Sequence, residues 1–112
     1  MASDEFRDTQ QEIATAVASN RVVLFMKGNP QFPQCGFSAS AVKMLIDIGV
    51  NDFAFVNVLE DHGIREGIKR YSSWPTIPQL YVDQEFVGGA DIMREMYQSG
   101  ELAKLLRQGG HA

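Results

Sequence analysis

Cysteine and histidine are scarce in this sequence. Its 112 residues include one cysteine, Cys35, and two histidines, His62 and His111. A single thiol cannot form a disulfide within the chain, which excludes a small secreted scaffold held by disulfides and suits a reducing compartment. The histidines have no metal-ligand spacing with each other or with the cysteine, so we expect neither of them to bind metal.

Long hydrophobic runs and an excess of positive charge are also missing. The longest apolar runs, such as residues 22–26, are far too short to cross a bilayer, and the acidic first residues do not resemble a secretory signal. The formal net charge of −4 argues against nucleic-acid binding as the main activity. We therefore expect a single domain over residues 1–112, with no membrane or nucleic-acid partner. The expected location is a bacterial-type cytoplasm, with a mature mitochondrial matrix protein as the alternative.

Hydrophobic periodicity and turn residues predict an alternation of helices and strands. Helices are predicted over residues 4–19, 35–48, 61–71 and 90–106, the last interrupted at Gly100, and strands over 21–27, 52–59, 78–82 and 85–87. The first strand–helix–strand unit implies a parallel pair, and the two-residue turn Asp83–Gln84 implies an antiparallel hairpin. The predicted fold class is α/β, with helices on both faces of a small mixed sheet. Residues 108–112 are expected to fray.

Cys35 lies between a loop rich in proline and glycine and the start of a predicted helix. Its sulfur should lie near unpaired N–H groups and the positive end of the helix dipole, and both lower a thiol pKa. Gly36 permits the close approach of a ligand, and Ser38 is expected to satisfy N–H groups in the first turn. The alternative is a buried, inert cysteine, but the loop favours an exposed sulfur.

Three basic residues are candidates for binding an anion. Lys27 ends the first predicted strand, at the sheet edge where Cys35 should lie, so it can stabilise a thiolate or bind a carboxylate. Arg65 and Lys69 are four residues apart and share one helix face. An anionic ligand would account for that pair, whereas their spacing alone favours an ordinary solvated face.

Residues 74–78 hold two prolines just before a predicted strand. This arrangement favours a cis Ile77–Pro78 bond. The backbone of Ile77 would then be unpaired and able to bind an extended peptide, as in strand addition. The alternative is an ordinary rigid turn.

The segment Gly88-Gly89-Ala90-Asp91 marks a junction between a strand and a helix. Free N–H groups at such a junction suit a carboxylate. Asp91 is expected to cap the helix and to accept from an ammonium group. A plain helix cap without a ligand is the alternative.

The order and spacing of these motifs resemble the monothiol glutaredoxins of the CGFS type, over about residues 8–106. The matching residues are Lys27, Cys35-Gly36-Phe37-Ser38, Trp74-Pro75-Thr76-Ile77-Pro78, Gly88-Gly89 and Asp91. The loop before Cys35 also resembles the longer loop of this branch. The resemblance implies a thioredoxin fold with a four-stranded mixed sheet in the order 2-1-3-4.

The resemblance further implies a glutathione groove. Lys27 and Arg65, with help from Lys69, would bind the glycine carboxylate, and Ile77 would pair its backbone with the cysteinyl part. Ala90 and Asp91 would receive the γ-glutamyl end, and Phe37 would flank the sulfur. The implied groove residues are completed by Thr76, Pro78 and Gly89.

The family's main role, binding and transferring a [2Fe–2S] cluster within a homodimer, agrees with the number of thiols. Such a cluster takes four ligands, usually thiolates. A symmetric dimer supplies two Cys35 thiolates, and two glutathione molecules would complete the set. We therefore expect an iron–sulfur carrier with glutathione and the cluster as cofactors, and with cluster-assembly or recipient proteins as partners.

Two other functions stay open. One is a glutathione-dependent oxidoreductase, in which Cys35 attacks protein–glutathione mixed disulfides. Many family members have a second cysteine where this chain has Ala90, so its redox cycle cannot use an intrachain disulfide. The other is an interaction module that recruits a cluster-handling partner through the exposed site.

Overall fold

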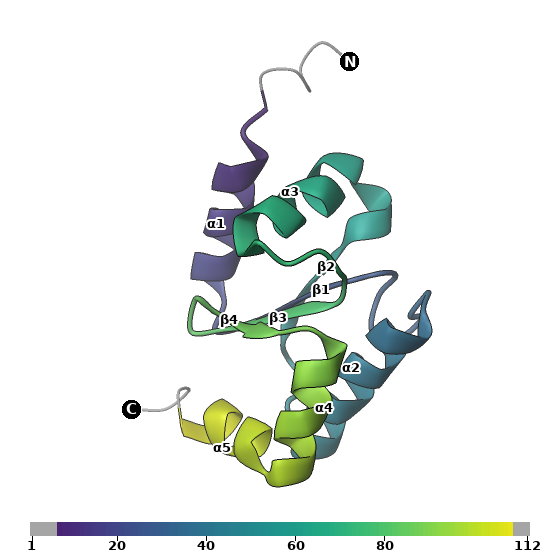
Figure 1. Ribbon diagram of the computed structural model, residues 1–112, viewed down its shortest axis with the longest axis vertical. Helices are drawn as coiled ribbons and strands as arrows, with labels where there is room; N and C mark the ends of the chain where they lie inside the picture. The colour runs from purple at the N-terminus through teal and green to yellow at the C-terminus, as the bar shows by residue number, and fades with distance from the viewer. Residues whose placement is uncertain (1–6, 109–112) are drawn as a thin grey trace.

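The computed structural model describes residues 7–108 as three layers, with one mixed sheet between two layers of helices (Figure 1). The strands are β1 (Val22–Met26), β2 (Ala54–Asn57), β3 (Gln79–Val82) and β4 (Glu85–Gly88). The helices are α1 (Thr9–Ser19), α2 (Gly36–Ile48), α3 (His62–Ser72), α4 (Ala90–Ser99) and α5 (Glu101–Gln108), with a 3-10 turn, η2 (Val58–Glu60). The strand order is β2-β1-β3-β4, which confirms the predicted thioredoxin fold.

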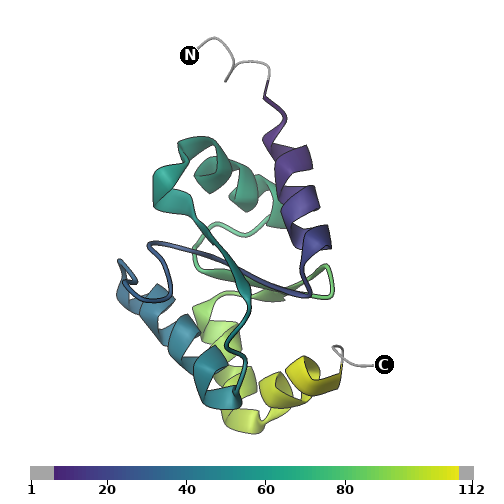
Figure 2. The same cartoon turned by 180° about the vertical axis from the view of Figure 1, so that it is seen from behind.

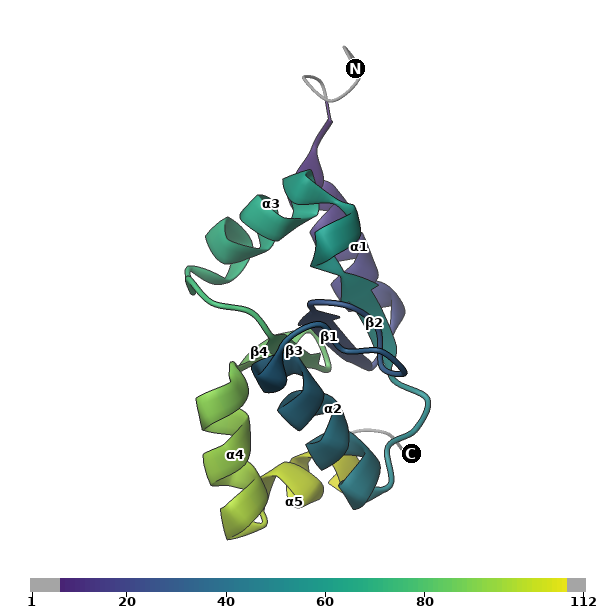
Figure 3. The ribbon, with the colours of Figure 1, turned by 90° about the vertical axis from the view of Figure 1, so that its right-hand side faces the viewer.

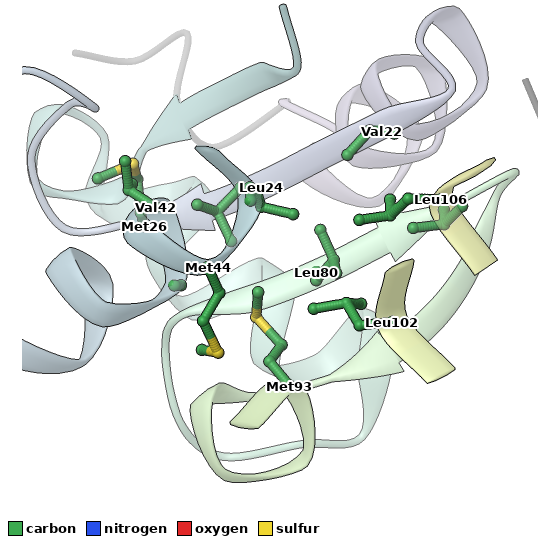
Figure 4. Packing of buried hydrophobic residues seen from close by; sticks show 12 residues of the cluster. Val22, Leu24, Met26, Val42, Met44, Leu80, Met93, Leu102 and Leu106 are labelled. Atoms are coloured by element: carbon green, nitrogen blue, oxygen red, sulfur yellow. The ribbon is translucent and has the colours of Figure 1, made fainter. Parts of the chain in front are cut away.

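Strand β1 lies inside the sheet and carries the core on both of its faces. It pairs parallel to β2 and antiparallel to β3, and all five of its residues are buried. Val23 and Phe25 pack against α1 and α3, whereas Leu24 faces the cluster formed with α2, α4 and α5 (Figures 3 and 4). The sequence of a strand that is covered on both faces is typically a continuous apolar run. That explains the run at residues 22–26.

Two predicted elements are too long. The first helix begins at Thr9, because the Asp8 side chain caps it by accepting the backbone N–H of Gln11 at 3.0 Å. Arg7 and Asp8 are therefore outside the helix, and residues 4–6 of the prediction lie outside the described residues. The second predicted strand, 52–59, is reduced to β2 because the chain turns into η2 directly after Asn57.

The turns and helix ends follow the other predictions closely. Asp83 and Gln84 both have positive φ, 51° and 70°, as a two-residue hairpin turn requires. Gly49 ends α2 with a left-handed backbone, and Gly100 separates α4 from α5. Residue 108 is the last residue of α5, and residues 109–112, the rest of the segment expected to fray, lie outside the described residues.

The topology brings five chain segments to one edge of the sheet. The connection from β1 loops out before it enters α2, as Figure 2 shows from behind. The end of β1, the start of α2, helix α3, the connection from α3 to β3 and the start of α4 all contribute to one cleft there. Among the described helices, none has the length and apolar character needed to span a membrane.

Candidate functional site

Cys35 is the N-cap residue of α2. Its backbone is extended, and its sulfur accepts the backbone N–H of Ser38 at 3.3 Å. The thiol is partly exposed. The sulfur therefore lies at the helix N-terminus, as the sequence predicts.

The surroundings of Cys35 favour the thiolate. Partial burial is the largest single influence and raises the thiol pKa. The Ser38 hydroxyl, the backbone N–H groups of Ser38 and Phe37, and the charge of Lys27 together outweigh it, so the pKa lies below its ordinary value. A thiolate is both the nucleophile and the metal ligand in cysteine chemistry.

Ser38 has a different role from the predicted one. Its side chain is fully buried, and its hydroxyl accepts the backbone N–H of Lys27 at 3.1 Å while lying 3.3 Å from the Cys35 sulfur. The cap of α2 comes from the cysteine sulfur instead. Ser38 thus connects the end of β1 to the sulfur.

The loop before Cys35 is held by Asn57, which the sequence patterns did not single out. The Asn57 Oδ1 accepts the backbone N–H of Gly28 at 2.9 Å and of Leu59 at 3.0 Å. Gly28 has a φ of 91°, and a Cβ there would lie 2.5 Å from the carbonyl oxygen of Phe32. The only hint in the sequence is an asparagine at the end of a strand, a residue type that hydrogen-bonds nearby backbone.

A cleft of about 370 Å³ lies beside the thiol. It brings together every residue predicted to contact glutathione: Lys27, Phe37, Arg65, Lys69, Thr76, Ile77, Pro78, Gly89, Ala90 and Asp91. Trp74, Pro75 and Ile92 complete its lining. Cys35 itself is not part of the lining, but the neighbouring Phe37 is, and the Phe37 side chain is 60% exposed.

The basic residues of the cleft differ in whether they form an ion pair. Lys69 Nζ lies 3.3 Å from Glu66 Oε2. Within residues 7–108, neither Lys27 nor Arg65 has an ion-pair partner, although both line the cleft. Two cations that line the same cleft and have no partner in this part of the chain can receive an anionic group.

The Ile77–Pro78 bond is cis, as the two prolines predict. The Ile77 side chain is 8% exposed, and its backbone N–H and C=O have no hydrogen-bond partner in the described part of the chain. The cleft therefore presents, on the side formed by this loop, the backbone N–H and C=O of Ile77 without hydrogen-bond partners.

Asp91 does not cap α4. The N-cap is Gly89, which makes no side-chain bond, and Asp91 lies one residue inside the helix with its side chain exposed to the cleft. The helix begins at Ala90 because Gly88 and Gly89 complete the turn out of the sheet. The first N–H groups of α4 and the Asp91 carboxylate are both available to a ligand.

The described residues contain no group of three or more His, Cys, Asp or Glu side chains placed to hold a metal ion. The chain has no thiol other than Cys35. One chain can therefore supply at most one thiolate to a metal.

Comparison with known proteins agrees with this geometry. The glutaredoxin family model matches residues 22–87. The mitochondrial monothiol glutaredoxin-5 of Lachancea kluyveri is 60% identical over 88% of this chain and 71% of its own length. Glutaredoxin 4 of Escherichia coli K12 is 48% identical over 89% of this chain and 86% of its own length.

Solved structures give the same result for the fold. The solution structure of reduced poplar apo GrxS14 has a TM-score of 0.77 at 49% identity, over 88% of this chain and 90% of that chain. The crystal structure of a buckwheat glutaredoxin–glutathione complex shares the fold at 21% identity, with a TM-score of 0.78 over 93% of both chains. With its single thiol at the start of α2, the chain belongs to the glutaredoxin family and, within it, to the monothiol glutaredoxins.

Proposed function

We propose that this protein binds glutathione in the cleft and, as a homodimer, carries a [2Fe–2S] cluster for transfer to recipient proteins. One observation carries the proposal: the only thiol of the chain has a lowered pKa and lies beside a cleft lined by Lys27 and Arg65, two cations with no ion-pair partner among residues 7–108. Each half of the dimer would contribute one Cys35 thiolate and one glutathione thiolate.

The chemistry of the cleft fits glutathione, a peptide with two carboxylates and one ammonium group. Lys27 and Arg65 are suited to the glycine carboxylate, with Lys69 beside them. The first N–H groups of α4 suit the γ-glutamyl carboxylate, and Asp91 suits its ammonium group. The unpaired backbone of Ile77 can hydrogen-bond the cysteinyl part as an added strand does.

The donor set fits the cluster as cargo. A [2Fe–2S] cluster is held by four ligands, commonly thiolates, and one thiol per chain supplies half of them in a dimer. The lowered pKa of Cys35 keeps its sulfur available as an anion. Glutathione bound in the cleft would present its own thiol next to Cys35. Ligands that exchange with solution favour release of the cargo to another protein.

Anaerobic reconstitution tests this proposal. The protein is mixed with iron, sulfide and glutathione, and its visible spectrum and molecular mass are measured. We expect a brown dimer with about one cluster per two chains. The Cys35→Ser variant, and the wild-type protein without glutathione, should stay colourless and monomeric. A cluster that forms on a monomer, or without glutathione, would contradict the proposal.

A second candidate function is favoured by the lowered pKa of Cys35. The Cys35 thiolate would attack the glutathione sulfur of a protein–glutathione disulfide and release the protein thiolate. A second glutathione thiolate would then attack the same sulfur, releasing the Cys35 thiolate and glutathione disulfide. Robust turnover in a deglutathionylation assay, abolished by Cys35→Ser, would favour this function over cluster transfer.

We further infer that the protein works in a reducing compartment. The relatives include proteins of bacteria and proteins named as mitochondrial. A bacterial-type cytoplasm is the proposed location, and the mitochondrial matrix is the alternative. Localisation of a fluorescently tagged full chain in its own cell would decide between them.

A further inference from the structure

Gln79, the first residue of β3, has a fully buried side chain, with 0% of its surface exposed. It pairs with Phe25 of β1, and all residues of that neighbouring strand are apolar and buried. Burying an amide in such surroundings costs free energy unless hydrogen bonds offset it. The Gln79 Oε1 has no hydrogen-bond partner among residues 7–108, so the side chain depends on the bonds that its Nε2 donates.

The acceptors of those bonds are two carbonyl groups of the loop that precedes β3. The Gln79 Nε2 donates to the carbonyl oxygen of Trp74 at 3.1 Å and to that of Thr76 at 3.0 Å. The loop includes Pro75 and Pro78, which have no N–H, so backbone donors are few there. The side chain of Gln79 takes the place of the missing backbone partners.

The bond to Thr76 also orients the next peptide group. In a trans peptide the C=O of one residue and the N–H of the following residue point in opposite directions. The Thr76 carbonyl points to the buried amide of Gln79, so the N–H of Ile77 points away from the interior. Ile77 lines the cleft, and its N–H has no partner among residues 7–108.

The bond to the Trp74 carbonyl fixes the beginning of the same loop. The indole Nε1 of Trp74 lies 3.2 Å from the position that a Cβ on Gly89 would occupy. The loop and the start of α4 are thus in close contact. Both segments line the cleft, so the position of the loop helps to shape it.

We infer that Gln79 is a positioning residue for the glutathione cleft, because its buried amide holds the loop so that the backbone of Ile77 faces the ligand. This inference rests on the proposed binding of glutathione. Gln79 touches no ligand itself. Its effect passes through the peptide groups of Trp74 and Thr76. Replacing Gln79 should therefore weaken the binding of glutathione but not that of a thiol that makes no contact with the cleft.

A disulfide exchange equilibrium measures that difference. Protein carrying a Cys35–mercaptoethanol disulfide is mixed with glutathione; the Cys35–glutathione disulfide forms, and 2-mercaptoethanol leaves with the thiol proton. One disulfide bond breaks and one forms, with no net oxidation. Because the Cys35 sulfur takes part on both sides, its pKa largely cancels. The equilibrium constant therefore reports the contacts of glutathione with the cleft.

In wild-type protein the exchange should favour glutathione. In Gln79→Met, which keeps the side-chain length but cannot donate, we expect the constant to fall by about tenfold. The matched control Gln98→Met makes the same change on the exposed surface of α4 and should leave the constant unchanged. Val17→Ala, a buried change in α1 away from the cleft, controls for lost stability and should lower the melting temperature without changing the constant.

Each outcome decides one point. If wild-type protein shows no preference for glutathione, the proposed groove itself is wrong and the role of Gln79 falls with it. If wild-type protein prefers glutathione and folded Gln79→Met prefers it equally, only the inference about Gln79 is overturned.

If Gln79→Met does not fold, NMR of wild-type protein tests the inference instead. The Gln79 side-chain amide should be protected from exchange and should shift with the glutathione adduct more than with the mercaptoethanol adduct. Equal shifts would overturn the inference.

Discussion

The hydroxyl of Ser38 lies 3.3 Å from the Cys35 sulfur and also accepts the backbone N–H of Lys27 at 3.1 Å. One buried side chain therefore supports the thiolate and fixes the end of β1 against the start of α2. The sulfur and the cation that stabilises it are positioned by the same group.

Replacing Ser38 with alanine should raise the pKa of Cys35, because the thiolate loses one of its hydrogen bonds. The rate of alkylation rises with pH as the thiolate forms. Its midpoint should lie below that of an ordinary cysteine in wild-type protein and higher in the variant. Stopped-flow alkylation across a pH series measures both.

The control is Ser40→Ala, on the next turn of the same helix, where the hydroxyl accepts only from Arg94 at 3.3 Å. That change should leave the midpoint in place. Ser38→Ala should also lower the free energy of unfolding by about 1 kcal/mol, because the partly buried N–H of Lys27 loses its acceptor. An unchanged midpoint in Ser38→Ala would show that the hydroxyl does not support the thiolate.

Arg65→Gln should weaken the preference for glutathione over 2-mercaptoethanol by about tenfold, because a charge-assisted bond to a carboxylate is lost. The exchange equilibrium described for Gln79 measures it. Arg70→Gln removes the same charge from the exposed last turn of α3, outside the cleft. If both variants lose preference equally, general charge and not a specific contact is responsible.

Glu66→Gln should strengthen glutathione binding. Glu66 holds Lys69 in an exposed ion pair at 3.3 Å, and removing its charge frees the lysine for the ligand. Exposed pairs are weak, so we expect a gain of about twofold to fivefold, which shrinks as salt is added. Glu95→Gln, an exposed change on α4, is the control. An unchanged affinity in Glu66→Gln would show that Lys69 does not contribute.

Asp61→Ala should lower the free energy of unfolding by about 1 kcal/mol or somewhat more. Asp61 caps α3 by accepting the N–H of Ile64 at 3.1 Å, and it accepts from Arg7 at 3.0 and 2.6 Å. The hydrogen bond from Arg7 is the main reason that the pKa of Asp61 lies below its ordinary value. Urea unfolding followed by the fluorescence of the single tryptophan measures the change.

The stabilising effect of Asp61 should depend on pH with a known sign. A carboxylate whose pKa is lowered by folding stabilises the protein above its unfolded pKa, about 3.9, and the effect is lost as pH falls through the folded pKa. The difference between wild-type protein and Asp61→Ala should therefore be largest near neutral pH and shrink in acid. A difference that grows in acid would contradict this assignment.

The sequence was sufficient for the features that depend on local patterns. The apolar run at 22–26, the helical spacing after Cys35 and the turn at Asp83–Gln84 all follow from neighbouring residues and were confirmed. The prediction of Asp91 as the helix cap was wrong by two positions, because the N-cap is Gly89 and the helix begins at Ala90. The end of β2 was missed because it depends on the hydrogen bonds of Asn57, one of them to Gly28 in another segment.

The sequence by itself determined the number of thiols, the position of Cys35 at a helix start, and the family. Only the tertiary structure decided which distant groups meet. Lys27, Arg65 and Asp91 come from three different elements, and they share a cleft because the sheet order brings those elements to one edge. The hydrogen bond between the buried Ser38 hydroxyl and the backbone of Lys27 also depends on packing between segments. Periodicity records which face of an element is apolar, but it does not record which atom of another element lies opposite.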